Sequence, residues 1–186
     1  MNLFQTILIL FGAFLGVFAE GVLTFPRSVL GAQVDVLPVL MVYAALNARL
    51  LAVVLLAIFG GIWADTFSAN PFGISILPLF TVGFSIFTQR ELVLRDLPFA
   101  QVVLGAIAGA AVPAFTLLML FSGGHKPVFG WGTLWQFAVM SLGSALLAPF
   151  IFKLLDWAQS AFGYQSRVEN SFRLDREIRR GRILKK

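Results

Sequence analysis

Residues 60–77 read GGIWADTFSANPFGISIL, and they place one carboxylate, Asp65, inside a chain that is otherwise almost continuously apolar. Two glycines precede Asp65, and Asn70 and Pro71 follow it. Asn70 is a favourable helix N-cap and Pro71 is favourable at the first helical position. The stretch therefore predicts the end of one apolar helix, a tight turn, and a second helix that begins at Pro71.

The composition predicts a membrane protein. Hydrophobic residues make up 59% of the 186 residues and charged residues make up 12%, whereas soluble domains carry roughly 25% charged residues. A small water-soluble globule cannot bury that much apolar surface, so lipid is the expected solvent. The chain has no cysteine, which excludes disulfides and thiolate metal sites.

The apolar runs predict an all-α membrane bundle of about six transmembrane helices. A span needs roughly 20 residues, so the second and third runs are short. The connector Asn47–Arg49 is tight enough to make these two an antiparallel hairpin. The bundle is assigned to residues 1–165 and a basic tail to residues 166–186. The predicted helices are 3–24, 34–47, 50–66, 71–89, 98–121 and 133–157.

The distribution of Lys and Arg predicts that both termini are cytoplasmic. With six spans, this orientation places twelve basic residues inside, eight of them in the tail, and leaves only Arg27 and Lys126 outside. The tail is expected to bind anionic lipid, or alternatively to dock a cytosolic partner. Its charge adjoins the membrane, which argues against a nucleic-acid binder. The predicted location is the bacterial inner membrane, as a multi-pass protein.

Three carboxylates, Glu20, Asp35 and Asp65, fall in the outer part of the predicted bilayer when each helical residue rises 1.5 Å. Arg27 is the nearby cation that the sequence offers as their partner. Charges inside membrane spans are costly and usually mark function. The alternatives are that these groups are hydrated at the interface or cap neighbouring helix ends.

Small residues precede two of these carboxylates by one helical turn. Gly16 stands four residues before Glu20, and Gly61 stands four residues before Asp65. Small residues at this spacing let helices approach closely, so both carboxylates are expected on helix contact faces. A third step, Gly105–Gly109, is expected to form a packing seam within the bundle, with a partner-docking groove as the alternative.

The sequence gives little support for an enzyme. His125 is the single histidine and lies in a Gly-rich loop, so we expect it to be a solvated loop residue. No serine stands in a Gly-x-Ser-x-Gly turn, and no phosphate-binding Gly-x-x-x-x-Gly-Lys loop is present. We therefore expect no catalytic residue, no metal and no cofactor.

Residues 34–79, VDVLPVLMVYAALNARLLAVVLLAIFGGIWADTFSANPFGISILPL, resemble the central region of the bacterial rod shape-determining MreD family. The family shows an Asp opening an apolar span, an aromatic-Ala-Leu end with a nearby Arg, and a second span. A Gly-x-x-x-Asp step, a small polar turn, Pro, a hydrophobe and Gly then follow. Here these positions are Asp35, Tyr43, Ala45, Leu46, Arg49, Gly61, Asp65, Ser68, Pro71 and Gly73.

The resemblance implies a non-enzymatic scaffold of the cell-elongation machinery that binds MreC. It implies further links to the glycosyltransferase RodA, to a penicillin-binding transpeptidase and, indirectly, to MreB. The family is also similar to the six-helix S-components of energy-coupling-factor transporters, so a subunit that binds a vitamin or metal ion stays open as the alternative. Residues expected to hold the structure or contact a partner are Glu20, Arg27, Asp35, Arg49, Gly61, Asp65, Pro71 and Gly73.

Overall fold

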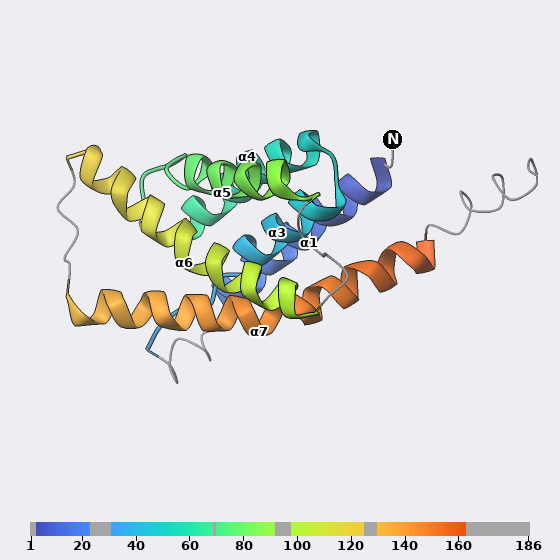
Figure 1. The fold of residues 1–186 in the computed structure, drawn as a ribbon. Coiled ribbons are helices and arrows are strands. Elements are labelled where there is room, and N and C mark those ends of the chain that lie inside the picture. The colour runs from blue at the N-terminus through green and yellow to red at the C-terminus, as the bar shows by residue number, and fades with distance from the viewer. Residues whose placement is uncertain (1–2, 23–30, 69, 92–97, 125–129, 163–186) are drawn as a thin grey trace, which may run out of the picture. The chain divides into compact units, whose positions relative to one another are not determined.

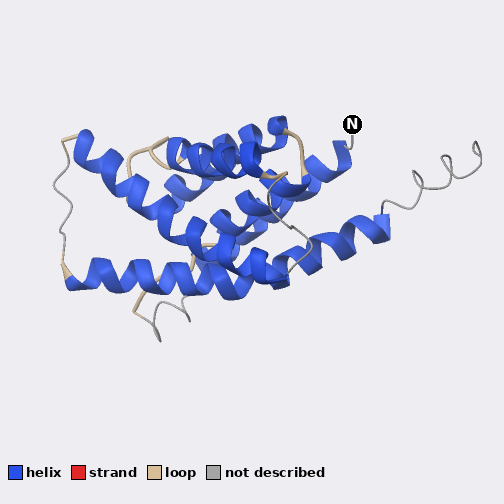
Figure 2. Ribbon diagram, viewed as in Figure 1, coloured by secondary structure: helices blue, strands red, loops and turns tan. Residues whose placement is uncertain are grey.

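The computed structural model describes residues 3–22, 31–68, 70–91, 98–124 and 130–162, and over these ranges it is helical without a strand (Figures 1 and 2). The chain divides into two compact units, residues 1–153 and 154–186, with the boundary inside the last helix. Arg27, His125 and the basic tail lie outside the described residues. The helices are α1 (Leu3–Val22), α3 (Leu37–Asn47), α4 (Leu50–Phe67), α5 (Ile76–Gln89), α6 (Pro98–Ser122) and α7 (Trp131–Phe162).

Four of these helices, α1, α4, α6 and α7, are long and apolar enough to cross a membrane. The prediction of an all-helical membrane protein is confirmed to that extent. Helices α3 and α5 have 11 and 14 residues, which corresponds to rises of about 16 and 21 Å. Both are shorter than the roughly 30 Å hydrocarbon core. The count of six spans and the orientation of the termini stay predictions.

Helix α3 forms the centre of the first unit. Every residue from Leu37 to Leu46 is buried, as expected for a helix that is apolar around its whole circumference. It packs against α1, α4, α5 and α6 (Figure 1). The ring of Tyr43 also meets the ring of Phe152 on α7 edge-on, with their centroids 4.9 Å apart. The buried core is therefore a short helix enclosed by longer ones.

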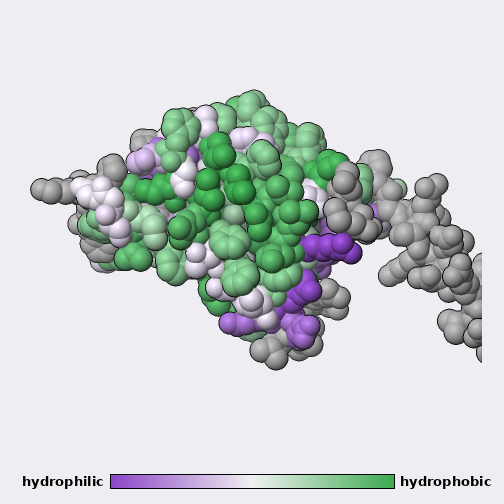
Figure 3. Space-filling view, turned by 90° about the horizontal axis from the view of Figure 1, so that it is seen from above, coloured by the Kyte–Doolittle hydropathy of each residue, from purple (hydrophilic) through white to green (hydrophobic). Residues whose placement is uncertain are grey.

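The enclosing helices turn apolar side chains outward. The face in Figure 3 is covered mostly by apolar residues, with polar ones gathered towards its margins. Such an extensive apolar surface would cause aggregation in water but suits lipid. Among the exposed large side chains are Phe4, Ile7, Phe11, Phe14 and Phe18 on α1, and Leu142, Leu146 and Phe150 on α7.

The connector between α3 and α4 is as tight as the sequence predicts, with Ala48 and Arg49 in extended conformation. The last carbonyls of a helix lack partners within the helix. Here Gln5 Nε2 donates to the Asn47 carbonyl at 3.0 Å, and Arg90 Nη1 donates to the Ala48 carbonyl at 3.2 Å. Arg49 itself is exposed. Side chains from α1 and from the end of α5 therefore stabilise this turn.

The predicted start of the fourth helix is wrong. Residues 71–75 form turns, and α5 begins at Ile76, so Asn70 is not its N-cap and Pro71 is not its first residue. Gly73 has a φ of +85°, which lies in the left-handed region and interrupts any helix that starts earlier. Asn70 and Pro71 favour a helix start locally, but tertiary hydrogen bonds stabilise a turn at this place instead.

The Gly105–Gly109 step forms an internal seam between α6 and α7, which confirms the expected packing within the bundle. A Cβ added to Gly105 would lie 2.8 Å from the Ala148 Cβ, and one added to Gly109 would lie 2.5 Å from the Ser144 Oγ. Ser141 Oγ donates across the seam to the Ala106 carbonyl at 2.9 Å. Close backbone approach and this hydrogen bond fix the part of α7 that belongs to the first unit.

Candidate functional site

Asp65, near the C-terminal end of α4, is 2% exposed and accepts three hydrogen bonds from the segment that begins α5. Its Oδ2 accepts the Gly73 N–H at 2.7 Å and the Ser75 N–H at 3.2 Å. Its Oδ1 accepts the Ser75 hydroxyl at 2.5 Å. Asp65 therefore caps the N-terminus of α5 from a different helix. We call this arrangement of Asp65, Gly73 and Ser75 the Asp65 cap.

The sequence around Asp65 makes this cap possible. Gly61, one turn earlier on α4, lies against the start of α5, where an added Cβ would be 2.9 Å from the backbone nitrogen of Ile76. The positive φ of Gly73 turns its N–H towards the carboxylate. A buried carboxylate is tolerated when donors replace its lost water, and a negative charge is favourable at a helix N-terminus. The Asp65 cap is a structural element.

Glu20 and Asp35 stabilise the N-terminus of α3 in a similar way. Glu20 Oε1 accepts the Val36 N–H at 2.5 Å, and Asp35 Oδ1 accepts the Leu37 N–H at 2.9 Å. The Gln33 side chain also hydrogen-bonds to Glu20, and the charge of Asp35 acts on the Glu20 carboxyl. The two carboxylates, distant in sequence, therefore lie together at the start of the central helix.

Asp35 belongs to the segment between α1 and α3, outside the helices, and burial raises the pKa of its carboxyl to about 6. The cause is loss of hydration, which penalises the charged form. The hydrogen bond from the Leu37 N–H lowers the pKa and so opposes part of this effect. The Asp35 carboxyl is consequently ionised at neutral pH and becomes protonated in mildly acidic solution.

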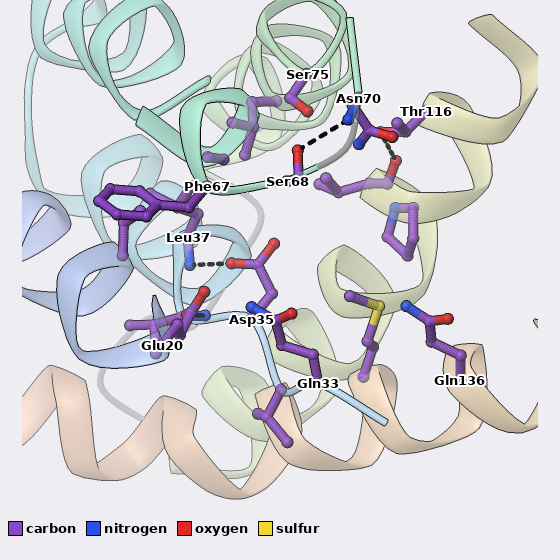
Figure 4. Close-up of a pocket in the computed structure, with 18 of the residues that line it drawn as sticks. Glu20, Gln33, Asp35, Leu37, Phe67, Ser68, Asn70, Ser75, Thr116 and Gln136 are labelled. Carbon is purple, nitrogen blue, oxygen red and sulfur yellow. Dashed lines mark hydrogen bonds between the residues drawn. The ribbon is translucent and has the colours of Figure 1, made fainter. Parts of the chain in front are cut away.

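Glu20 and Asp35 face a cavity of about 940 Å³ within the first unit, which we call the acidic cavity (Figure 4). This volume is in the range of small-molecule sites, roughly 300–1,000 Å³. The cavity lies among the C-terminal parts of α1, α4 and α6, residues 33–37, and the N-terminal half of α7. Its polar lining includes Glu20, Gln33, Asp35, Asn70, Thr116 and Gln136.

The acidic cavity has a one-sided charge. Among the described residues that line it, Glu20 and Asp35 are the charged ones, and both are acidic. Figure 4 shows them beside Gln33 on one side, with Thr116 and Gln136 on the other. Its walls between these groups are largely apolar. The arrangement is suited to hold a positively charged group against an apolar surface.

The predicted site residues separate into three groups. Glu20 and Asp35 meet at the acidic cavity, whereas Gly61 and Gly73 support the Asp65 cap and Pro71 lies in the turn beside it. Arg49 lies at the other end of α4 from Asp65, about 24 Å away along the helix. Sequence reasoning missed Gln33, Ser75, Thr116 and Gln136, whose signal was a polar side chain within or beside an apolar run.

No three His, Cys, Asp or Glu side chains come together as metal ligands among the residues that the structure describes. Comparisons with protein-family models, with curated proteins and with solved structures give no match. The inference of function therefore rests on the residues of this chain.

Proposed function

We propose that this protein is a non-enzymatic scaffold of the bacterial cell-elongation machinery in the inner membrane, of the rod shape-determining MreD type. In this role it binds MreC and, through that complex, connects to RodA, a penicillin-binding transpeptidase and MreB. The proposal combines the motif in residues 34–79 with the positions of the motif residues in the fold.

The observation that carries the proposal is that several motif residues, Tyr43, Gly61 and Asp65 among them, are buried where the helices of the first unit pack together. Tyr43 is completely buried in α3, Gly61 permits the contact between α4 and α5, and Asp65 caps α5 through Gly73. A motif of this kind describes a fold rather than a reactive centre. It supports a protein that acts as a rigid membrane body to which partners bind.

Co-purification tests this proposal. The tagged full-length chain is extracted from its native membranes in mild detergent, and the bound proteins are identified by mass spectrometry. The expected result is a stoichiometric single-span protein with a periplasmic domain, absent from a control preparation of an unrelated tagged multi-pass protein. Recovery of the chain with an ATPase complex in place of such a partner contradicts the scaffold.

The acidic cavity favours a second candidate function, a solute-binding subunit of a transporter. Its volume of about 940 Å³ and its mixed polar and apolar lining are typical of a small-molecule site. A retained small ligand together with an ATPase complex in the same purification supports this candidate. Helix α3 contributes its first residue, Leu37, to the cavity, next to the lining residues 33–36.

A further inference from the structure

We propose that the acidic cavity is a binding site for an organic cation, an ammonium or guanidinium group carried on an apolar stem. The charged head lies between Glu20 and Asp35, and the stem lies against the apolar wall. This inference concerns the cavity alone and does not depend on the scaffold function proposed above.

Charge determines the head group. The described lining residues contribute two carboxylates and no positively charged group. Each carboxylate uses one oxygen for a backbone N–H of the α3 segment, at Val36 and Leu37. A carboxylate has two oxygens and about four acceptor positions, so further acceptor positions exist on both. Two adjacent carboxylates repel each other, and a cation between them relieves this repulsion.

The wall determines the rest of the ligand. The cavity is also bounded by apolar side chains of α4, α5, α6 and α7, and a site of this kind favours a ligand that is polar at one end and apolar at the other. A bare metal ion would leave this apolar surface in contact with water. The principal apolar residues of the wall are Phe67, Leu79, Val112, Leu117, Phe137 and Met140.

The same chemistry has two sources, a free alkylamine and a Lys or Arg side chain of a partner protein. Both present a cation on an aliphatic stem, so the site is expected to accept a simple alkylammonium probe in either case. Mass spectrometry of protein purified from native membranes separates the sources. If the ligand is a free solute, a small cation is detected with the wild-type protein and is missing from the Glu20→Gln/Asp35→Asn variant. If it is a partner's side chain, a bound protein is missing from the variant instead.

Isothermal titration calorimetry of the full chain in detergent at pH 7.5 tests the site, with hexylamine hydrochloride as the probe. Hexanol and sodium hexanoate are matched controls that keep the stem and change the head. Because hydrogen bonds to charged groups are stronger than neutral ones, hexylammonium is expected to bind about tenfold or more tightly than hexanol. Hexanoate is expected to bind more weakly than either.

The double variant Glu20→Gln/Asp35→Asn removes the charges but keeps an oxygen to accept the Val36 and Leu37 N–H groups. Its expected affinity for hexylammonium equals that for hexanol. Glu91→Gln is the matched control, because it removes an exposed carboxylate beyond the far end of α5 and should leave binding unchanged. Equal binding of hexylammonium by wild type and double variant overturns the proposal.

A cation from the chain itself is the competing occupant, and Arg27 is the candidate that the sequence offers. The Arg27→Ala variant addresses it in the same titration. The proposal expects wild type and Arg27→Ala to bind hexylammonium within about threefold of each other. Binding seen in Arg27→Ala and not in wild type shows that the site is filled internally, and it overturns the proposal. Partner co-purification is measured separately, so failure here does not affect the scaffold proposal.

Discussion

The Asp65 cap and the acidic cavity both contain carboxylates that lie out of bulk water, but Asp65 is buried whereas Glu20 and Asp35 are only partly buried. The ends of α1 and α4 are adjacent, since an added Cβ on Gly21 would lie 3.2 Å from the Phe67 ring. Asp65 uses both oxygens on three donors and is almost completely buried. Glu20 and Asp35 cap a helix as well, yet they also line the acidic cavity. A carboxylate whose partners are all internal stabilises the fold, whereas one beside a cavity is available to a ligand.

The largest expected effect is that of Asp65→Leu. The substitution leaves the N–H groups of Gly73 and Ser75 and the Ser75 hydroxyl without their acceptor in a buried place. Each buried unpaired group costs about 1–3 kcal/mol, so a loss of about 3 kcal/mol or more is expected. Thermal unfolding in detergent measures it, with Asp65→Asn as the milder control because the amide keeps one acceptor. A wild-type melting temperature in Asp65→Leu contradicts the structural role.

Gly61→Ala tests the approach of α4 and α5 that the Asp65 cap requires. The new Cβ would lie 2.9 Å from the Ile76 backbone, which cannot move away as a flexible side chain would. Overpacking of this kind costs about 1–3 kcal/mol. Gly132→Ala is the matched control, since no atom lies within 4 Å of its added Cβ. Equal melting temperatures for the two variants would show that the close approach is not needed.

Acid is expected to weaken cation binding at the acidic cavity. The charged groups that face the probe from the described lining are Glu20 and Asp35, and burial raises the pKa of Asp35 to about 6. Above pH 6 the Asp35 carboxyl is ionised and attracts the probe, and below pH 6 protonation removes that charge. Affinity for hexylammonium should therefore fall as the pH drops through 6, towards the affinity of the Glu20→Gln/Asp35→Asn variant and not below it. Calorimetry from pH 7.5 to pH 5 measures this change, and a flat profile argues against Asp35 as a ligand-binding group.

The smallest expected effect is on the stability of Glu20→Gln/Asp35→Asn. The amide oxygens still accept the Val36 and Leu37 N–H groups, and the substitution removes two adjacent acidic groups from a partly buried place. The melting temperature should stay near that of wild type, with a change in unfolding free energy below about 1 kcal/mol. Loss as large as that of Asp65→Leu would mean that both carboxylate groups are equally structural, and the difference between the two regions would disappear.

The sequence predicted the helices well because apolar runs decide where a chain in lipid forms them. It could not predict the start of α5, since Asn70 and Pro71 carry a valid local signal that Asp65, on another helix, overrides. The acidic cavity could not be predicted from the sequence either. Glu20, Gln33, Thr116 and Gln136 come from distant segments, and only the fold brings them to one space.

The most direct measurement is one calorimetric comparison of wild type, Asp65→Asn and Glu20→Gln/Asp35→Asn with hexylamine hydrochloride, each preparation first checked for folding by its melting curve. Our account predicts that wild type and Asp65→Asn bind the amine alike, while the double variant binds it about tenfold or more weakly. Our account holds that Asp65 stabilises the fold whereas Glu20 and Asp35 bind a ligand. Equal binding by all three proteins, or loss of binding in folded Asp65→Asn alone, would contradict it.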